Sequence, residues 1–153
     1  MKVLLAVDGS PCSDAAIDEV ANRPWPVGTT IRVLSAFELP LPPTPEAWAL
    51  PPRYVQEIEE AGREGAKRIV NAALDQLGNK TGITIEGKYA VGPPKKVILE
   101  EAEEWEADLI VLGSHGYTTW ERFLLGSVSQ GVVSHAKCSV EVARLPKPAK
   151  AVA

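Results

Sequence analysis

The sequence predicts an α/β protein built on an open parallel sheet with helices on both faces. Short apolar runs alternate with longer segments in which apolar residues recur every three or four positions. Most of the runs are uninterrupted, as in strands that are buried on both faces. The chain has 153 residues, about the size of one domain. We therefore expect a single domain over residues 1–145, followed by a flexible tail at 146–153.

The first predicted strand covers residues 3–7, and a helix follows over residues 10–22. The apolar run of the strand ends at Asp8, where a polar turn begins. Ser10 has a side chain that is preferred at a helix N-cap, and Pro11 has the backbone angle preferred at the first helical position. The turn between the first strand and this helix is therefore expected to be short.

The second predicted strand covers residues 31–37, and residues 38–53 form an irregular loop. That loop contains six prolines, which exclude regular structure there. A long helix is predicted over residues 54–77. Gly62 and Gly65 weaken its middle, so a bend at these positions is an open possibility.

The third predicted strand covers residues 83–91, and the fourth covers residues 108–113. Gly92 and two prolines turn the chain into a helix between these strands. The fourth strand is again apolar throughout, as in strands that are buried on both faces.

A last helix is predicted to begin at Ser127. Ser127 and Gln130 have the spacing of a capping box, with serine at the N-cap and glutamine at position N3. The last predicted strand covers residues 138–144 and alternates apolar with polar residues. The succession of strands and helices requires crossover connections, which are right-handed in parallel sheets.

Composition and charge exclude several functional classes. The chain has 16 basic and 20 acidic residues and no basic cluster, which argues against nucleic acid as the main partner. No apolar run approaches the length of a membrane span, and the N-terminus does not resemble a secretory signal, so we expect a cytoplasmic protein. Cys12 and Cys138 lie far apart, and we expect both thiols to be reduced and buried.

Two strand ends carry the residues of chemical interest. The first strand ends at residues 8–10, and the fourth ends at residues 113–116; nine residues later, Gly126 and Ser127 begin the last helix. Glycines allow backbone N–H groups to approach an anion, and a helix N-terminus is a natural phosphate site. The alternative is that these glycines are ordinary turn residues and Ser127 is only a cap. The residues alone leave both interpretations open.

The pattern Gly113-x-x-Gly116-(nine residues)-Gly126-Ser127 resembles the nucleotide-binding motif of the universal stress protein family. Three blocks support the resemblance, at residues 2–10, 107–116 and 124–140, and it extends over residues 2–144. It implies a Rossmann-like domain with strand order 3-2-1-4-5, which is usually a homodimer. The subgroup that has this motif binds ATP, here expected together with Mg²⁺.

The resemblance also implies which residues contact the nucleotide. Asp8 and the backbone beside it would meet the adenosine, and Asp8 is also the candidate Mg²⁺ ligand. The end of the second strand would lie near the adenine, Gly92 near the ribose, and the glycine motif around the phosphates. The expected nucleotide-binding set is Ala6, Val7, Asp8, Ser10, Ser35, Ala36, Gly92, Gly113, Ser114, Gly116, Gly126, Ser127, Val128 and Ser129.

Two features depart from the family pattern. Thr119 stands where the family often has a glycine, and Ser35 with Ala36 replaces a common His-Val pair. Arg122 is the cation between Gly116 and Gly126, and it either touches a phosphate or simply faces solvent. We expect no catalytic role for His115, because no serine or cysteine nucleophile lies in a recognisable elbow beside it.

The last strand is the expected homodimer contact, from Ser139 to Arg144. Val140 and Val142 lie on one face of this strand, and an uncovered edge strand favours pairing with a second copy. The alternative is an edge that is shielded by the charges of Glu141 and Arg144.

The leading functional interpretation is therefore an ATP-binding regulatory or stress-response protein with slow or no hydrolysis. A weak ATPase or a nucleotidyl-transfer enzyme on the same fold is the second interpretation. The third is a dimeric interaction module that does not depend on nucleotide. The sequence does not distinguish among ATP, ADP and AMP.

Overall fold

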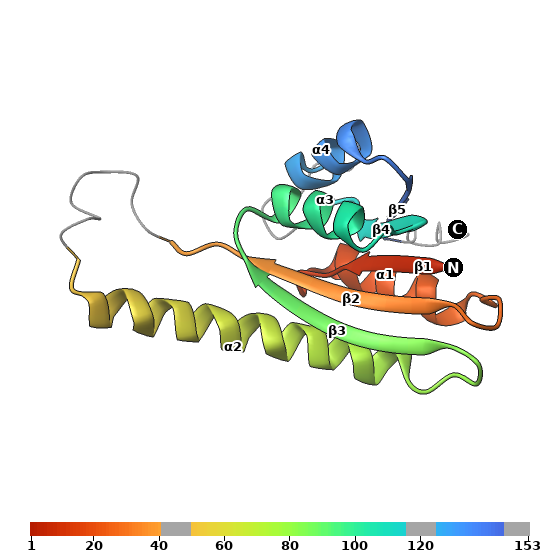
Figure 1. The fold of residues 1–153 in the computed structure, drawn as a ribbon, viewed down its shortest axis with the longest axis horizontal. Helices are drawn as coiled ribbons and strands as arrows, with labels where there is room; N and C mark the ends of the chain where they lie inside the picture. Colours follow the sequence, from red (N-terminus) through yellow and green to blue (C-terminus); the bar gives the residue numbers. More distant parts are fainter. Residues whose placement is uncertain (41–49, 116–124, 146–153) are drawn as a thin grey trace, which may run out of the picture.

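The computed structural model describes residues 1–40, 50–115 and 125–145. Within these residues, parallel strands form one sheet in the order β3-β2-β1-β4-β5 (Figure 1). The strands are β1 (Lys2–Ala6), β2 (Thr30–Phe37), β3 (Thr84–Val91), β4 (Leu109–Gly113) and β5 (Ser139–Ala143). The order of the strands reverses between β1 and β4, and this confirms the predicted fold class.

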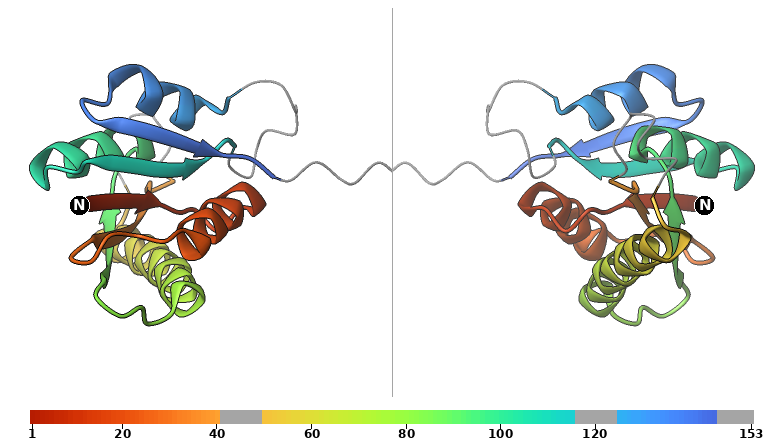
Figure 2. Two further views of the ribbon diagram at one scale, coloured as in Figure 1. Left: turned by 90° about the vertical axis from the view of Figure 1, so that its right-hand side faces the viewer. Right: turned by 90° about the vertical axis from the view of Figure 1, so that its left-hand side faces the viewer.

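Two helices cover each face of the sheet. Successive connections move from β1 outward to β3 and then return to β4 and β5. Because each crossover is right-handed, the helices before and after the reversal lie on opposite faces. Figures 1 and 2 show α1 and α2 on one face and α3 and α4 on the other. The helices are α1 (Pro11–Asn22), α2 (Pro52–Leu77), α3 (Pro94–Glu104) and α4 (Ser127–His135).

Strand β1 contributes side chains to the hydrophobic cores on both faces. Val3 and Leu5 pack in the cluster beneath α1 and α2, whereas Leu4 and Ala6 pack in the cluster beneath α3 and α4. Val3, Leu4 and Leu5 are fully buried. Burial on both faces is the physical reason that the strand is an unbroken apolar run.

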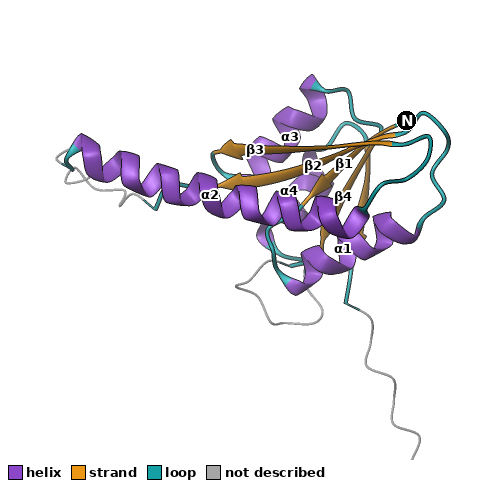
Figure 3. Cartoon of the chain, turned by 90° about the horizontal axis from the view of Figure 1, so that it is seen from below, coloured by secondary structure: helices purple, strands orange, loops and turns teal. Residues whose placement is uncertain are grey.

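Helix α2 is one continuous helix of 26 residues, so the bend considered at Gly62 and Gly65 does not interrupt it. Gly62 has a packing role, because a Cβ there would lie 2.5 Å from Cδ2 of Phe37. The N-terminal half of α2 projects beyond the sheet (Figures 1 and 3). Its buried side chains begin at Ala66.

A group of buried charges joins α3 to β2 and β3. The Glu101 carboxylate is 6% exposed and accepts hydrogen bonds from Arg32 and Lys88. Burial alone would lower the pKa of Arg32, but hydrogen bonds from its guanidinium to Glu101 and Glu86 raise that pKa above its usual value. The guanidinium also lies 4.1 Å from the ring centroid of Trp105, so this tryptophan has a packing role.

Strand β5 forms the edge of the sheet beside β4. Val140 and Val142 pack toward α3 and α4, as the alternating pattern predicts. On the opposite face, Glu141 accepts hydrogen bonds of 2.6 and 2.8 Å from Arg23, the C-cap residue of α1. Glu141, one of the two charged residues considered as a shield for this edge, is thus paired within the same chain.

Several sequence predictions fall on residues that the structure does not describe, including the tail and most of the proline-rich loop. Cys12 and Cys138 are free thiols, but both are partly exposed, so the prediction of full burial is wrong. Cys12 lies in the first turn of α1, and Cys138 lies just before β5. Burial raises the pKa of the Cys138 thiol. In the described part of the chain, no helix is long and apolar enough to cross a membrane.

Candidate functional site

The carboxyl ends of β1 and β4 meet at the point where the strand order reverses. Residues 8–10 follow β1, and residues 114–115 follow β4, at the same edge of the sheet. The two segments touch, because the Ser10 hydroxyl donates a hydrogen bond of 3.3 Å to the carbonyl of His115. In open α/β sheets, ligands bind at this kind of reversal.

The turn between β1 and α1 is held by its own side chains. The Asp8 carboxylate accepts a 2.9 Å hydrogen bond from the N–H of Ser10, and the N–H of Asp8 donates to the Ser13 hydroxyl at 3.2 Å. Ser10 is the N-cap of α1, as predicted, and its hydroxyl accepts from the N–H of Ser13. The start of α1 is therefore capped within the protein, and Asp8 remains exposed to solvent.

The end of β4 packs directly against the first turn of α1. A Cβ on Gly113 would lie 2.6 Å from the carbonyl carbon of Cys12, so the backbones approach too closely for any side chain. Beyond Gly113, the carbonyl of Ser114 accepts a 2.8 Å hydrogen bond from the N–H of Gly126. This bond brings together two residues that are twelve positions apart, just before α4 begins. Gly116, Thr119 and Arg122 lie between them, outside the described residues.

Helix α4 begins without a side-chain cap, and this corrects the predicted capping box. Its N-cap is Gly126, with extended backbone angles (φ −62°, ψ 159°), and Ser127 is already the first helical residue. Because Ser127 is helical, its hydroxyl is one position too late to cap the helix in the predicted way. The first intrahelical bond is from the N–H of Gln130 to the carbonyl of Gly126. The N–H groups of the first turn, those of Ser127, Val128 and Ser129, therefore have no partner inside the helix and no side-chain cap.

The side chain of Ser129 supports this helix start from behind. Its buried hydroxyl donates toward two carbonyl oxygens, that of Ser114 at 2.8 Å and that of Gly126 at 2.9 Å. The hydroxyl proton is used inside the protein, so Ser129 offers a ligand only its backbone N–H. A Cβ on Gly126 would also crowd this junction, at 3.3 Å from the Cα of His115.

The remaining predicted residues lie along the same edge at β1, β2 and β3. Ala6 and Val7 are buried at the end of β1, so they offer a ligand mainly backbone groups. Ser35 is buried and Ala36 is partly exposed near the end of β2. Gly92 follows β3, and its N–H donates to the carbonyl of Phe37 at 2.9 Å. It is separated from β1 by the whole of β2.

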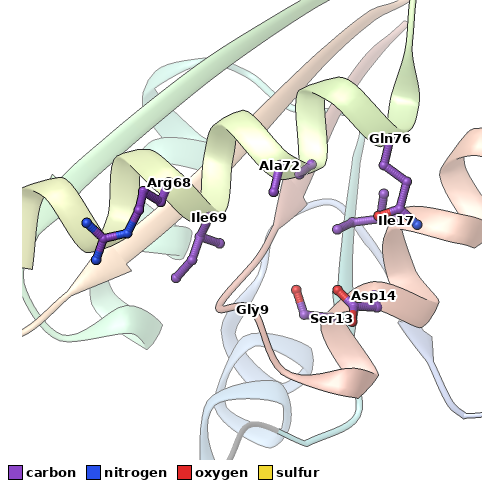
Figure 4. Close-up of a pocket in the computed structure, with 9 residues that line it drawn as sticks. Gly9, Ser13, Asp14, Ile17, Arg68, Ile69, Ala72 and Gln76 are labelled. Atoms are coloured by element: carbon purple, nitrogen blue, oxygen red, sulfur yellow. The ribbon is translucent and has the colours of Figure 1, made fainter.

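A groove of about 290 Å³ lies between α1 and α2, beside the end of β1 (Figure 4). Gly9, Ser13 and Ile17 line it on one side, and Arg68 and Gln76 lie on the other. Its volume is at the lower limit for small-molecule sites, which start at roughly 300 Å³. Neither β4 nor α4 lines this groove, so it is separate from the uncapped helix start. None of the residues that line it was predicted from the sequence to bind a ligand.

The donor groups at the strand reversal fit an anionic ligand better than a metal ion alone. Among the described residues, no three His, Cys, Asp or Glu side chains gather into a metal cluster. Backbone N–H groups at the start of α4 are instead suited to phosphate oxygens. The exposed carboxylate at this edge is that of Asp8.

One side chain at this edge is a feature that sequence reasoning missed. Nδ1 of His115 lies 3.1 Å from the Ser114 hydroxyl, whereas its Nε2 is buried without a hydrogen-bond partner. The position of His115, inside the glycine motif, was the available signal. His115 was considered for catalysis but was not predicted as a binding residue.

An open parallel sheet that reverses at β1 and β4, with an uncapped helix start beside the reversal, defines a Rossmann-like α/β protein. The model of the universal stress protein family matches residues 1–144. The chain belongs to the universal stress protein family.

Individual relatives and solved structures agree with this assignment. The chain is 30% identical over 149 residues to universal stress protein MJ0531 of Methanocaldococcus jannaschii, covering 95% of this chain and 83% of the relative. The structure of UspA from Lactobacillus plantarum is 25% identical with a TM-score of 0.76, covering 94% of this chain and 97% of that one.

Two further similar structures contain nucleotides. A universal stress protein in complex with cAMP is 25% identical with a TM-score of 0.63, covering 94% of this chain and 96% of that chain. A family member from Arabidopsis thaliana with AMP bound has a TM-score of 0.63, covers 98% and 97% of the two chains, and at 19% identity shows the shared fold alone.

Proposed function

We propose that this chain is an ATP-binding regulatory protein of the stress-response type, cytoplasmic and dimeric, with slow or no hydrolysis. The observation that carries the proposal is the uncapped start of α4 at the strand reversal. Phosphate oxygens would accept hydrogen bonds from the unpaired N–H groups there, and the positive end of the helix dipole favours the negative charge of the phosphates. The cAMP-bound and AMP-bound family structures support the choice of an adenine nucleotide.

Each part of the edge would then take one part of the nucleotide. The N–H groups of residues 127–129 bind phosphate, and Gly126 leaves room for the tight junction behind them. Asp8 contacts Mg²⁺ bound to the phosphates. The ends of β2 and β3, at residues 35–36 and 92, lie along the edge toward the adenosine.

Slow turnover follows from the donor groups at the site. Rapid hydrolysis needs groups that position and activate water and stabilise the leaving phosphate. Among the described residues, Asp8 is the proposed Mg²⁺ contact, and it belongs to no group of three His, Cys, Asp or Glu side chains. The binding groups favour a nucleotide that is held rather than consumed.

The dimer contact proposed is the edge strand β5, from Ser139 to Arg144. Val140 and Val142 are only partly buried within one chain, although they pack toward α3 and α4. Pairing with the β5 of a second copy would cover these valines and would provide hydrogen-bond partners for the unpaired backbone groups of the edge strand. A mass measurement at micromolar concentration tests this, and a monomer would contradict it.

Calorimetric titration with Mg-ATP tests the nucleotide proposal, with two variants of the helix start. Ser127 is exposed, so Ser127→Asp adds a negative charge without crowding the interior. The charge stabilises the helix N-terminus by about 0.3–1 kcal/mol but repels phosphate. We expect micromolar binding by the wild type and at least a tenfold loss in Ser127→Asp. Gly126→Ala, which crowds Ser114 and His115, should also lose binding.

Ser134→Asp is the matched control, because it adds the same charge at the exposed C-terminal end of α4. It should leave Mg-ATP binding unchanged. If a folded wild type does not bind Mg-ATP at millimolar concentration, the proposal is wrong, and the chain is better described as a nucleotide-independent interaction module. Sustained phosphate release that Gly126→Ala abolishes would instead favour the weak ATPase.

A further inference from the structure

Strand β3 forms the second edge of the sheet, on the side opposite β5 (Figure 1). In the part of the chain that the structure describes, β3 pairs with β2 alone. The strand is eight residues long, against five in β5, and residues 87–89 and 91 are exposed. An open edge strand has unpaired N–H and C=O groups, which can pair with another strand.

The pairing with β2 determines which backbone groups of β3 face the open side. The N–H groups of Thr84 and Gly92, at the two ends of the strand, donate to carbonyls on the β2 side at 3.0 and 2.9 Å. Because the backbone groups of successive residues point in opposite directions, the even-numbered residues between these two also face β2. The N–H and C=O groups of Ile85, Gly87 and Tyr89 therefore face the open side.

The two charged residues of β3 do not cover this edge. Natural edge strands are often shielded by charged side chains, lysine above all. Here Glu86 is bonded to Arg32 of β2. Lys88 is bonded to Glu101 of α3. Both charges are thus held inward on the α3 face, but their side chains remain 42% and 46% exposed, so a neighbouring strand can still contact them.

The other face of β3 presents apolar side chains at the same edge. Ile85 packs partly against the core beneath α1 and α2. Tyr89 is 37% exposed and Val91 is 44% exposed, although both are large and apolar. Gly87 lies between Ile85 and Tyr89, where a Cβ would be 2.5 Å from Cγ1 of Val70 in α2. The edge therefore combines an apolar face with a face that carries one acid and one base.

The sequence of β3 is complementary to itself when two copies run in opposite directions. If two strands pair antiparallel about Gly87, each Glu86 lies opposite the Lys88 of the second copy. Ile85 then lies opposite Tyr89, and glycine lies opposite glycine. Opposite charges and aromatic–aliphatic pairs are favourable across an antiparallel ladder, whereas like charges are not. Centring the pair on Glu86 or Lys88 would place like charges opposite each other, so the charges select the alignment about Gly87.

The backbone groups match in the same alignment. In an antiparallel pair, opposite residues alternate between those that exchange two hydrogen bonds and those that exchange none. Gly87 would bond to its copy, and Ile85 to Tyr89, because the backbone groups of these residues face the open side. Glu86 and Lys88 would form the other kind of pair, in which opposite side chains lie closer together.

We propose that the open edge of β3 binds a second copy of this chain, antiparallel, about a two-fold axis at Gly87. Each copy contributes the same residues, as in other contacts with two-fold symmetry. The contact goes beyond the proposed function, because it lies opposite β5 and requires no nucleotide. It is small, so we expect it to form at high protein concentration. Together with the contact proposed at β5, it would join more than two copies.

Cysteine cross-linking tests the alignment. Thr84 would lie opposite Ala90 of the second copy, at a position without backbone hydrogen bonds, where Cα atoms are about 4.5 Å apart. A disulfide can form at this separation. With Cys12→Ser and Cys138→Ser as the background, we expect Thr84→Cys/Ala90→Cys to form a disulfide-linked dimer on mild oxidation at high protein concentration.

The two single cysteine variants are the matched controls. Residues 84 and 90 lie at opposite ends of β3, about 20 Å apart, so neither a bond within one chain nor a bond between identical positions is expected. Cross-linking in the double variant alone is the expected result. Equal cross-linking in a single variant, or none in the folded double variant at millimolar concentration, overturns the inference.

Sedimentation of the chain with its native cysteines gives a second test. Tyr89→Lys places a charge against Ile85 of the second copy, where it has no partner, and should raise the dissociation constant of this contact at least tenfold. Tyr54→Lys is the matched control, because Tyr54 is 50% exposed in the half of α2 that projects beyond the sheet (Figure 3).

The two proposed contacts are distinguishable in this experiment. If both form, wild type and Tyr54→Lys should grow beyond a dimer as concentration rises, whereas Tyr89→Lys should stop at the dimer joined through β5. If the β5 contact is wrong, wild type should pass from monomer to dimer, and Tyr89→Lys should stay monomeric. Association of Tyr89→Lys equal to that of the wild type overturns the inference at β3 and leaves the nucleotide proposal intact.

Discussion

Helices α1 and α4 begin at the same edge of the sheet, but their first turns are completed differently. The start of α1 has a serine cap, Ser10, and a proline at its first position. The start of α4 has Gly126 at the N-cap and no side-chain cap. The two starts are adjacent, because Ser10 contacts His115 and His115 contacts Gly126.

The difference separates a structural role at α1 from the proposed binding role at α4. A capped helix start stabilises the fold by itself, whereas an uncapped one leaves N–H groups for a ligand. Stability measurements should therefore be sensitive to the residues around α1, and binding measurements to those around α4. The following substitutions test that division, in order of decreasing expected effect on stability.

Gly113→Ala should have the largest effect, because it forces the end of β4 away from the first turn of α1. The added Cβ would lie within 3 Å of backbone atoms of Cys12 and Ser13, and backbone cannot move aside cheaply. We expect the free energy of unfolding to fall by about 3 kcal/mol. Urea denaturation measures this. Gly65→Ala is the control, because its Cβ would lie in open space beside Arg68 and should stabilise α2 by up to about 1 kcal/mol. Equal effects of the two substitutions would contradict the close packing at Gly113.

Ser10→Ala and Ser127→Ala compare the two helix starts directly. Ser10→Ala removes the cap of α1 and leaves the N–H of Ser13 without its acceptor, so the free energy of unfolding should fall by about 1–2 kcal/mol. Ser127→Ala should change it by less than about 0.5 kcal/mol, because Ser127 is exposed and caps nothing. Both are measured by thermal or urea unfolding. If Ser127→Ala lowers the free energy of unfolding as much as Ser10→Ala does, then Ser127 caps α4 after all, as the sequence predicted.

Ser129→Ala should have a smaller effect on stability than Ser10→Ala. Both carbonyls that accept from its hydroxyl also accept from a backbone N–H, so neither loses its last partner. We expect a fall of about 0.5–1 kcal/mol in the free energy of unfolding. Mg-ATP binding should weaken more clearly than stability does, because the hydroxyl positions the start of α4. Unchanged binding in a less stable protein would show that Ser129 acts in the fold alone.

The elements of the fold could be predicted from the sequence because their signals are local. The unbroken apolar run of β1 results from burial on both faces of the sheet. The Ser10-Pro11 pair results from the requirements of a helix start at α1. The capping box at Ser127 was wrong by one residue. Its Ser-x-x-Gln spacing is present, but the chain enters α4 through Gly126, and no local preference distinguishes the two registers.

The place of the candidate residues in the fold could be predicted from the sequence, but not the contacts that they make there. The positions after β1 and β4 follow from the topology of a parallel sheet, so Asp8 and Ser114 were expected at one edge. The hydrogen bonds that turn the Ser129 hydroxyl inward, and the unpaired nitrogen of His115, depend on contacts between distant parts of the chain. No spacing in the sequence reports such contacts.

Helix α2 has the same regular backbone along its length, yet its side chains are buried only from Ala66 onward. Amide hydrogens in the half that projects beyond the sheet are therefore protected by the helix alone, whereas those after Ala66 are protected by the core. Deuterium should enter the projecting half by fraying, long before the whole protein unfolds. Exchange times should therefore lengthen along α2 from its N-terminus to its C-terminus. The residue at which they reach the exchange time set by global unfolding marks the boundary of the cooperative core.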